Sequence, residues 1–121
     1  MSDDFCLNTF HSYQLDGDDG TSKMQDVMKM FRYGFKSLGG VEVVRVVDCS
    51  AGSDRGSGAV EYRLAGGSSV EIRPSRFMPK IEVYFLITGS SRKDAAEIEK
   101  RVIEDVENII YIDYRAGYCC E

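Results

Sequence analysis

The sequence predicts an α+β domain of two layers, in which a mainly antiparallel sheet carries two helices on one face. Three observations lead to this fold class. The chain has 121 residues, the size of one domain with its own hydrophobic core. Several short runs alternate apolar with polar residues or are rich in β-branched residues, and turn-like segments join most of them. Two longer runs carry apolar residues at helical spacing, and one face of the sheet is where both can bury them.

The predicted element order is β-α-β-β-β-β-α. A first strand is expected at residues 9–15, and the Asp- and Gly-rich residues 16–20 then form a turn. A helix is expected from Thr21 to Leu38, followed by two glycines that end it. Its buried stripe consists of apolar residues three and four positions apart, namely Met24, Val27, Met28, Phe31, Phe35 and Leu38.

Four more strands and a second helix complete the order. The strands are expected at 41–49, 59–65, 69–75 and 80–88. A Gly- and Ser-rich loop, 50–58, precedes the second of these, and Gly66-Gly67 is a hairpin signal. Ser90 or Ser91 caps a helix that runs to about Ile110. The buried stripe of this helix is Ala95, Ile98, Val102, Val106 and Ile109.

Composition narrows the class of function. The formal net charge is −5, which argues against nucleic acid as a partner because phosphate-backbone binding needs a basic surface. No apolar run approaches the ~18 residues of a membrane span, and the N-terminus lacks the features of a signal peptide. We therefore expect a cytoplasmic protein with no membrane partner.

The four cysteines have no metal-binding spacing and are expected to be reduced thiols: Cys6, Cys49, Cys119 and Cys120.

Three motifs that could carry chemistry fit ordinary structural roles better. The acidic turn at 16–20 fails the EF-hand pattern, because Gly20 stands at the fifth position and Val27 at the twelfth. The Gly-rich loop at 50–58 lacks the G-K-[ST] ending of a nucleotide-phosphate loop. His11 has no evident nucleophile partner and is expected to be a strand residue. No catalytic residue, metal site or cofactor is predicted in this chain.

The most informative stretch is EIRPSRFMPKIEVYF, residues 71–85. Strand alternation turns Arg73 away from the buried face just where the chain turns, and its guanidinium can fork onto phosphate oxygens. Ser75 can add a hydroxyl, and the loop backbone can add N–H groups to an anion-binding nest. Pro74 and Pro79 stiffen the two ends. These residues fit either an anion site or a Pro-braced strand connection with one surface arginine.

The segment RPSRFMPKIEVYF also resembles the phosphate-binding segment of the α-D-phosphohexomutases, the phosphoglucomutase and phosphomannomutase superfamily. That segment typically reads R-P-S-G-T-E-P-K before a strand, and the matching residues here are Arg73, Pro74, Ser75, Pro79 and Lys80. The stretch LDGDDGTSKMQDVMKMFR is similar to the Gly-Lys-Met helix start in the last domain of longer family members. The strand VEVVRVVDC fits in its place, so the resemblance extends from about Phe10 to Ile110.

The resemblance implies that residues 1–121 form one domain equivalent to the fourth, C-terminal domain of such an enzyme. That domain has a TBP-like fold, with a core here at about 10–110 and an extra tail at 111–121. In the parent enzymes the first domain carries a phosphoserine, the second a Mg²⁺ loop and the third sugar contacts. The fourth grips the phosphate of the phosphosugar that is not reacting. The resemblance assigns phosphate binding to Arg73, Ser75, Arg76, Phe77 and Lys80, and implies Mg²⁺ only for a full-length parent.

The loop departs from the family pattern at three consecutive positions. The family's Gly, Thr and Glu are here Arg76, Phe77 and Met78, so the phosphate loop is degenerate. The chain also has no candidate phosphoserine loop and no three-Asp metal loop, and we expect it not to be a mutase by itself.

Three interpretations follow. The chain is a phosphosugar-binding mutase domain, present as a fragment or as one chain of a split enzyme, whose partners are a hexose phosphate and the remaining mutase domains. Alternatively, it is a freestanding non-catalytic relative that binds another protein through Phe77 and Met78, residues of a type common at interfaces. The third interpretation is an unrelated α+β domain.

Overall fold

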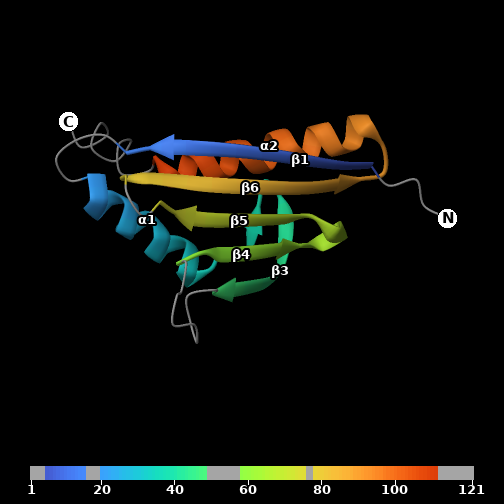
Figure 1. Ribbon diagram of the computed structural model, residues 1–121. Coiled ribbons are helices and arrows are strands. Elements are labelled where there is room, and N and C mark those ends of the chain that lie inside the picture. Colours follow the sequence, from blue (N-terminus) through green and yellow to red (C-terminus); the bar gives the residue numbers. More distant parts are fainter. Residues whose placement is uncertain (1–4, 16–19, 49–57, 76–77, 112–121) are drawn as a thin grey trace, which may run out of the picture.

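The structure of the chain is a computed structural model that describes residues 5–15, 20–48, 58–75 and 78–111. These residues form a six-stranded antiparallel sheet with two α-helices (Figure 1), and the strand order is β1-β6-β5-β4-β3-β2. The elements in chain order are β1 (Phe5–Gln14), α1 (Gly20–Tyr33), β2 (Ser37–Leu38), β3 (Val41–Asp48), β4 (Val60–Leu64), the 3₁₀ turn η1 (Ala65–Gly67), β5 (Ser69–Pro74), β6 (Lys80–Gly89) and α2 (Arg92–Ile110).

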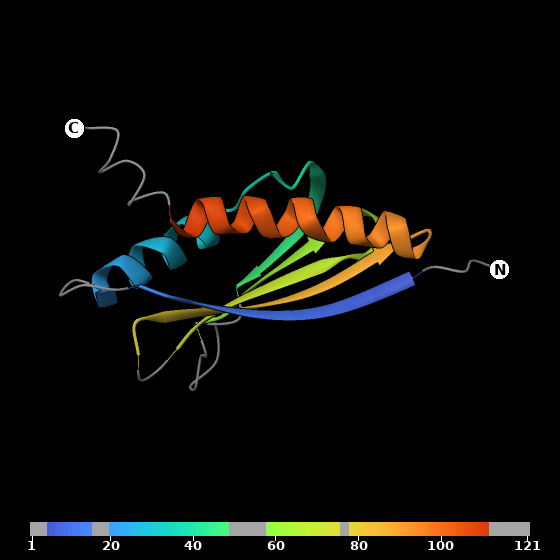
Figure 2. The ribbon, with the colours of Figure 1, turned by 90° about the horizontal axis from the view of Figure 1, so that it is seen from above.

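Both helices lie on the same side of the sheet (Figure 2). The predicted fold class, a two-layer α+β domain with a mainly antiparallel sheet, is confirmed. No helix in the described part of the chain covers the opposite side, which we call the open face. None of the helices described has the length and apolarity that a membrane span requires.

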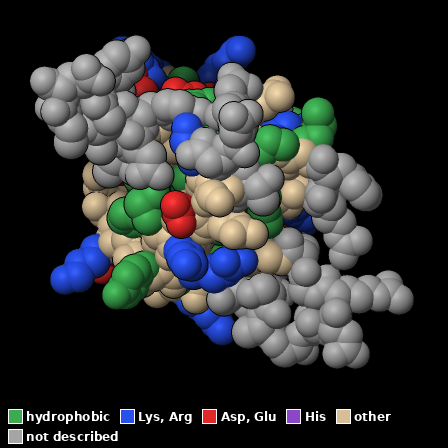
Figure 3. Space-filling view, turned by 90° about the vertical axis from the view of Figure 1, so that its left-hand side faces the viewer, with side chains coloured by type: hydrophobic (Ala, Val, Ile, Leu, Met, Phe, Trp, Pro, Cys, Tyr) green, Lys and Arg blue, Asp and Glu red, His purple; other side chains and the backbone are tan. Residues whose placement is uncertain are grey.

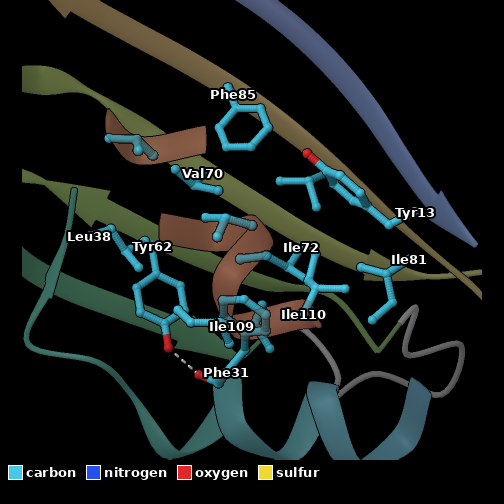
Figure 4. Packing of buried hydrophobic residues seen from close by; sticks show 14 of the residues in the cluster. Tyr13, Phe31, Leu38, Tyr62, Val70, Ile72, Ile81, Phe85, Ile109 and Ile110 are labelled. Carbon is cyan, nitrogen blue, oxygen red and sulfur yellow. Dashed lines mark hydrogen bonds between the residues drawn. The ribbon is translucent and has the colours of Figure 1, made fainter. Parts of the chain in front are cut away.

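The core lies between the sheet and the helices, as the alternation of the strands predicts. In β6 every second residue is buried on the helix side: Ile81, Val83, Phe85 and Ile87. The predicted helix stripes meet them, with Val27, Met28 and Phe31 buried in α1, and Ala95, Val102, Val106 and Ile109 buried in α2. Figure 4 shows Phe31 and Ile109 of these stripes beside the buried residues of the sheet. Burying each large apolar side chain contributes roughly 1.5–3 kcal/mol, so these facing surfaces hold the two layers together.

The first helix ends earlier than predicted. It stops at Tyr33 rather than Leu38, because Gly34 takes a backbone φ of 97°, a left-handed conformation that glycine adopts without strain. Ser37 and Leu38 then form the short strand β2, which pairs with the start of β3. Leu38 is buried as predicted, but it reaches the core from a strand and not from a helix.

A buried tyrosine ties the end of α1 to the sheet. The Tyr62 hydroxyl, on β4, donates a hydrogen bond to the Phe31 carbonyl (Figure 4) and accepts one from the Phe35 N–H at 3.2 Å. Both backbone groups lie where α1 ends, and the hydroxyl therefore satisfies groups that have no partner within the helix. Burial, which outweighs the opposing effect of the Phe35 hydrogen bond, raises the pKa of Tyr62 to about 12.

This pKa predicts an alkaline loss of stability. An unfolded tyrosine ionises near pH ~10, whereas folded Tyr62 keeps its proton until about pH 12. The contribution of the Tyr62 proton to the free energy of unfolding is complete below pH ~10 and is lost as the pH rises through 12. The loss amounts to up to about 3 kcal/mol over these two pH units. Urea unfolding between pH 9 and 12 measures this loss. We expect the free energy of unfolding to fall less with pH in Tyr62→Phe than in the parent chain. Tyr33→Phe, a control at an exposed site, should behave like the parent. Equal falls in all three proteins would contradict this origin.

The second helix begins as its sequence predicts. Ser91 is the residue that caps it, and its hydroxyl accepts a hydrogen bond from the Asp94 N–H at 3.1 Å. The Asp94 carboxylate accepts one from the Ser90 N–H at 2.9 Å. These two hydrogen bonds satisfy the backbone N–H of Asp94 in the first turn and that of Ser90 just before the cap.

Candidate phosphate-binding loop and the open face

The predicted phosphate segment forms the connection between β5 and β6. The two strands pair up to Pro74 and Ile81, and the Ser75 N–H then donates to the Lys80 carbonyl at 2.8 Å. The Lys80 N–H donates to the Met78 carbonyl at 2.7 Å. Because the hairpin itself uses the Ser75 N–H, this group is not available to cradle a phosphate. Arg76 and Phe77 lie outside the described residues.

The loop lies against the start of α1 (Figure 1). The Leu15 N–H donates to the Pro79 carbonyl at 2.8 Å. A Cβ atom added to Gly20, the first residue of α1, would lie 2.9 Å from the Pro79 Cβ and 2.4 Å from the Leu15 carbonyl oxygen. The loop and the helix start are therefore in direct contact, and only glycine fits there. The N-terminus of a helix carries a partial positive charge that favours anions.

Arg73, the main predicted phosphate ligand, is already paired. Its guanidinium lies 2.6 Å from a Glu71 carboxylate oxygen and 5.7 Å from the centre of the Tyr84 ring. The hydrogen bond to Glu71 is the main cause that raises the pKa of Arg73. Glu71 precedes Arg73 by two residues on the same face of β5, so the pairing draws the guanidinium back along the sheet and away from the loop.

Lys80 lies on the open face as well. Its Nζ is 3.7 Å from a Glu82 carboxylate oxygen, and Glu82 stands directly opposite Arg73 in the β5–β6 register. The structure thus brings Arg73 and Lys80 to one face, and it places two carboxylates beside them. Figure 3, seen from the end of the molecule that carries the loop, shows basic, acidic and hydrophobic side chains next to one another. Strand alternation already places Glu71 on the same face as Arg73, but the sequence did not indicate that the two side chains pair or that Glu82 stands opposite Arg73.

The open face also holds a shallow hollow that the sequence analysis did not predict. Its volume is about 410 Å³. It is lined by Asn8, Thr9, Phe10, Glu61, Ser69, Glu71, Tyr84, Phe85 and Leu86. Phe10 is 50% exposed and Tyr84 is 42% exposed, and the centres of their rings lie 4.7 Å apart. Strand alternation could have indicated this hollow, because it places Phe10 and Tyr84 on the face that points away from the core.

Among the residues described, no group of three or more His, Cys, Asp or Glu side chains could hold a metal ion. The acidic turn at 16–20 lies outside this part of the chain, apart from Gly20. Cys6 is an exposed, free thiol, and the other three cysteines lie outside the described residues.

The fold and the loop together define a two-layer α+β domain with an open antiparallel sheet and a Pro-braced hairpin beside a helix start. No protein-family model matches the chain, and no curated protein matches it. Among solved structures it is similar to the exocytosis-sensitive phosphoprotein pp63/parafusin, a phosphoglucomutase from Paramecium, in its open form. The TM-score is 0.53 with 19% sequence identity, over 88% of this chain and 20% of that chain. The chain therefore shares its fold with part of that phosphoglucomutase and spans about one fifth of its length.

Proposed function

We propose that the chain is a phosphosugar-binding domain related to the phosphohexomutases and equivalent to their fourth, C-terminal domain. It holds the phosphate that does not react, and the chemistry resides in other domains. The observation that carries the proposal is the hairpin in which Arg73, Ser75 and Lys80 match the family pattern and which contacts the start of α1. The fold likeness to a phosphoglucomutase supports it.

A phosphate clamp of this kind acts by positioning. Phosphoryl transfer depends mainly on holding the reacting groups in line and on stabilising charge. A remote phosphate contact supplies binding energy that orients the other end of the sugar. In this chain Arg73 and Lys80 provide the positive charge, the start of α1 adds its partial charge, and Ser75 adds a hydroxyl donor.

The test is an amide NMR titration of the whole chain with glucose 1-phosphate and glucose 6-phosphate, and with inorganic sulfate as a control. We expect saturable shifts confined to the residues around the loop, 73–80, at roughly millimolar ligand, since a lone clamp binds weakly. The shifts should be larger for the sugar phosphates than for sulfate. A flat response from a well-dispersed spectrum would contradict phosphosugar binding.

The pairing of Arg73 predicts that Glu71→Gln strengthens binding. Removing this carboxylate frees the guanidinium 2.6 Å away and removes a negative charge that repels phosphate. We expect the affinity for glucose 6-phosphate to rise about fivefold, a change of roughly 1 kcal/mol, as measured by the same titration.

Glu61→Gln provides a matched control. Glu61 stands directly opposite Glu71 in the β4–β5 register, but its own ion-pair partner is Arg63, at 3.6 Å. This variant makes the same change in charge on the same face without freeing Arg73. Equal effects of the two substitutions would show that general charge, and not the Arg73 pairing, sets the affinity.

A second candidate function is that of a non-catalytic protein-interaction module. Met78, the last of the three altered loop residues, is 48% exposed, and exposed methionines adapt well to protein surfaces. This candidate predicts no response to either sugar phosphate. It also predicts that Met78→Ser weakens binding to the partner, either another protein chain or the remaining mutase domains, while the chain stays folded.

A further inference from the structure

The sheet has one protected edge and one unprotected edge. At the β2 end the outermost strand is two residues long, and the β3–β4 pairing beside it shifts register between Val43 and Arg45. Short strands and bulges of this kind prevent pairing with another chain. At the other end β1 is ten residues long and pairs in continuous register with β6 only, among the elements described.

The composition of β1 gives its edge no protection. The strand reads FCLNTFHSYQ and contains no Asp, Glu, Lys, Arg or Pro, although the whole chain carries 35 acidic and basic residues. Charged side chains and proline are the usual devices that stop an exposed strand from pairing. A long, regular edge without them is a template for a further strand.

The hydrogen bonds identify which backbone groups face outward. The Leu15 N–H donates to the Pro79 carbonyl, so the backbone of Leu15 points toward β6. Alternate residues of an antiparallel strand point their N–H and C=O groups to the same side. The odd-numbered residues of β1 therefore face β6. The groups that face the free edge belong to Cys6, Asn8, Phe10, Ser12 and Gln14.

We propose that β1 pairs with β1 of a second copy of the chain, antiparallel and centred on Phe10, to form a symmetric dimer. A two-fold axis at this position places the two Phe10 residues opposite each other, Asn8 opposite Ser12, and Cys6 opposite Gln14. This register uses every outward-facing N–H and C=O group of the strand. A register centred one residue earlier would leave Gln14 beyond the paired region.

The side chains on the open face also favour a second copy of the chain as the partner. Phe10 and Tyr84 are both exposed, with ring centres 4.7 Å apart. The proposed pairing joins the two Phe10 rings and continues the row to Tyr84 of the second copy. Aromatic cross-strand pairs of this type stabilise sheets. Because β1 is uncharged, it offers no selective attraction for an acidic or basic peptide, and two chains of net charge −5 meet there without direct repulsion.

Sedimentation equilibrium of the full chain, from about 5 µM to 0.5 mM, tests the proposal. We expect a concentration-dependent dimer of twice the 13.6 kDa chain mass. In hydrogen exchange followed by NMR, the N–H groups of the five outward-facing residues should become protected as the concentration rises. A chain that remains monomeric up to 0.5 mM would overturn the proposal, and so would a dimer in which these five groups exchange freely.

Two pairs of variants locate the contact. Phe10→Lys places like charges at the symmetry axis and should weaken dimerisation at least tenfold, whereas Tyr33→Lys adds the same charge at an exposed residue of α1 and should leave dimerisation unchanged. Asn8→Pro removes an outward N–H without removing a bond to β6, and its control is Asn8→Ala. Circular dichroism checks that each variant is folded. If Phe10→Lys or Asn8→Pro dimerises like its control, the proposed edge is wrong.

Discussion

Replacing Gly39 with alanine is expected to lower the free energy of unfolding by about 3 kcal/mol. The residue has a φ of 60°, which costs a non-glycine residue roughly 1–2 kcal/mol. In addition, an alanine Cβ would lie 2.6 Å from the Val102 nitrogen and 2.7 Å from the Arg101 carbonyl carbon, so the backbone of α2 would have to move. Backbone shifts from overpacking typically cost ~1–3 kcal/mol. Urea unfolding followed by circular dichroism measures the difference.

A substitution at the neighbouring residue, Gly40, separates the cost of backbone strain from the cost of close packing. Gly40 has a φ of 82°, but nothing lies within 4 Å of a Cβ added there. Gly40→Ala should therefore cost only the conformational strain, about 1 kcal/mol. If both variants lose the same stability, close packing against α2 is not the reason for the glycine at position 39.

The close contact between Gly39 and α2 explains how this edge of the sheet is fixed to the helix layer. The Gly39 N–H donates to the Asp105 carboxylate of α2 at 2.8 Å, next to the place where the glycine allows the two backbones to approach. The turn after β2 is thus held by a hydrogen bond and by close packing at the same point. From the sequence alone the two glycines there are expected only to end a helix, because Arg101 and Val102, which require a glycine at position 39, lie more than 60 residues further along the chain.

The elements that could be predicted are those whose signal is local. The apolar alternation in β6 and the helical spacing in α2 each identify a buried face from fewer than 20 consecutive residues, and both predictions are confirmed by the burial of Ile81, Phe85 and Val102. The end of α1 was misplaced because Leu38 continues the helical spacing from a short strand. Its burial is real, but the spacing cannot tell a helix from a strand that follows a glycine turn.

The state of the candidate site could be predicted only in part. Alternation correctly placed Arg73 on the face opposite the core. Its pairing with Glu71 depends on side-chain geometry along one strand, and the carboxylate of Glu82 depends on the register between two strands. The sequence shows which cationic residues lie near a turn. The affinity of the site for an anion, however, depends on the net charge that remains after these cations have paired with carboxylates.

Introducing the phosphohexomutase pattern that the loop resembles is expected to give the largest gain in ligand affinity. The variant Arg76→Gly, Phe77→Thr, Met78→Glu returns a residue that tolerates positive φ, a hydroxyl donor, and a carboxylate that can accept hydrogen bonds from sugar hydroxyls. Together these changes should strengthen glucose 6-phosphate binding at least tenfold, or roughly 1.4 kcal/mol, in the NMR titration. No gain in a variant that keeps a well-dispersed spectrum would count against an inherited phosphate site.

Two further variants decide how the gain arises. Arg73→Ala in the restored background should remove most of it, since a phosphate loop without its guanidinium retains few charge-assisted contacts. Adding Glu71→Gln to the restored loop should strengthen binding further, because one change supplies contacts and the other frees a cation. Nearly additive free energies would mean that the loop and the Glu71 pair limit binding independently. If Glu71→Gln adds nothing once the loop is restored, the restored loop itself draws Arg73 away from Glu71, and the ion pair along β5 is a consequence of the altered loop.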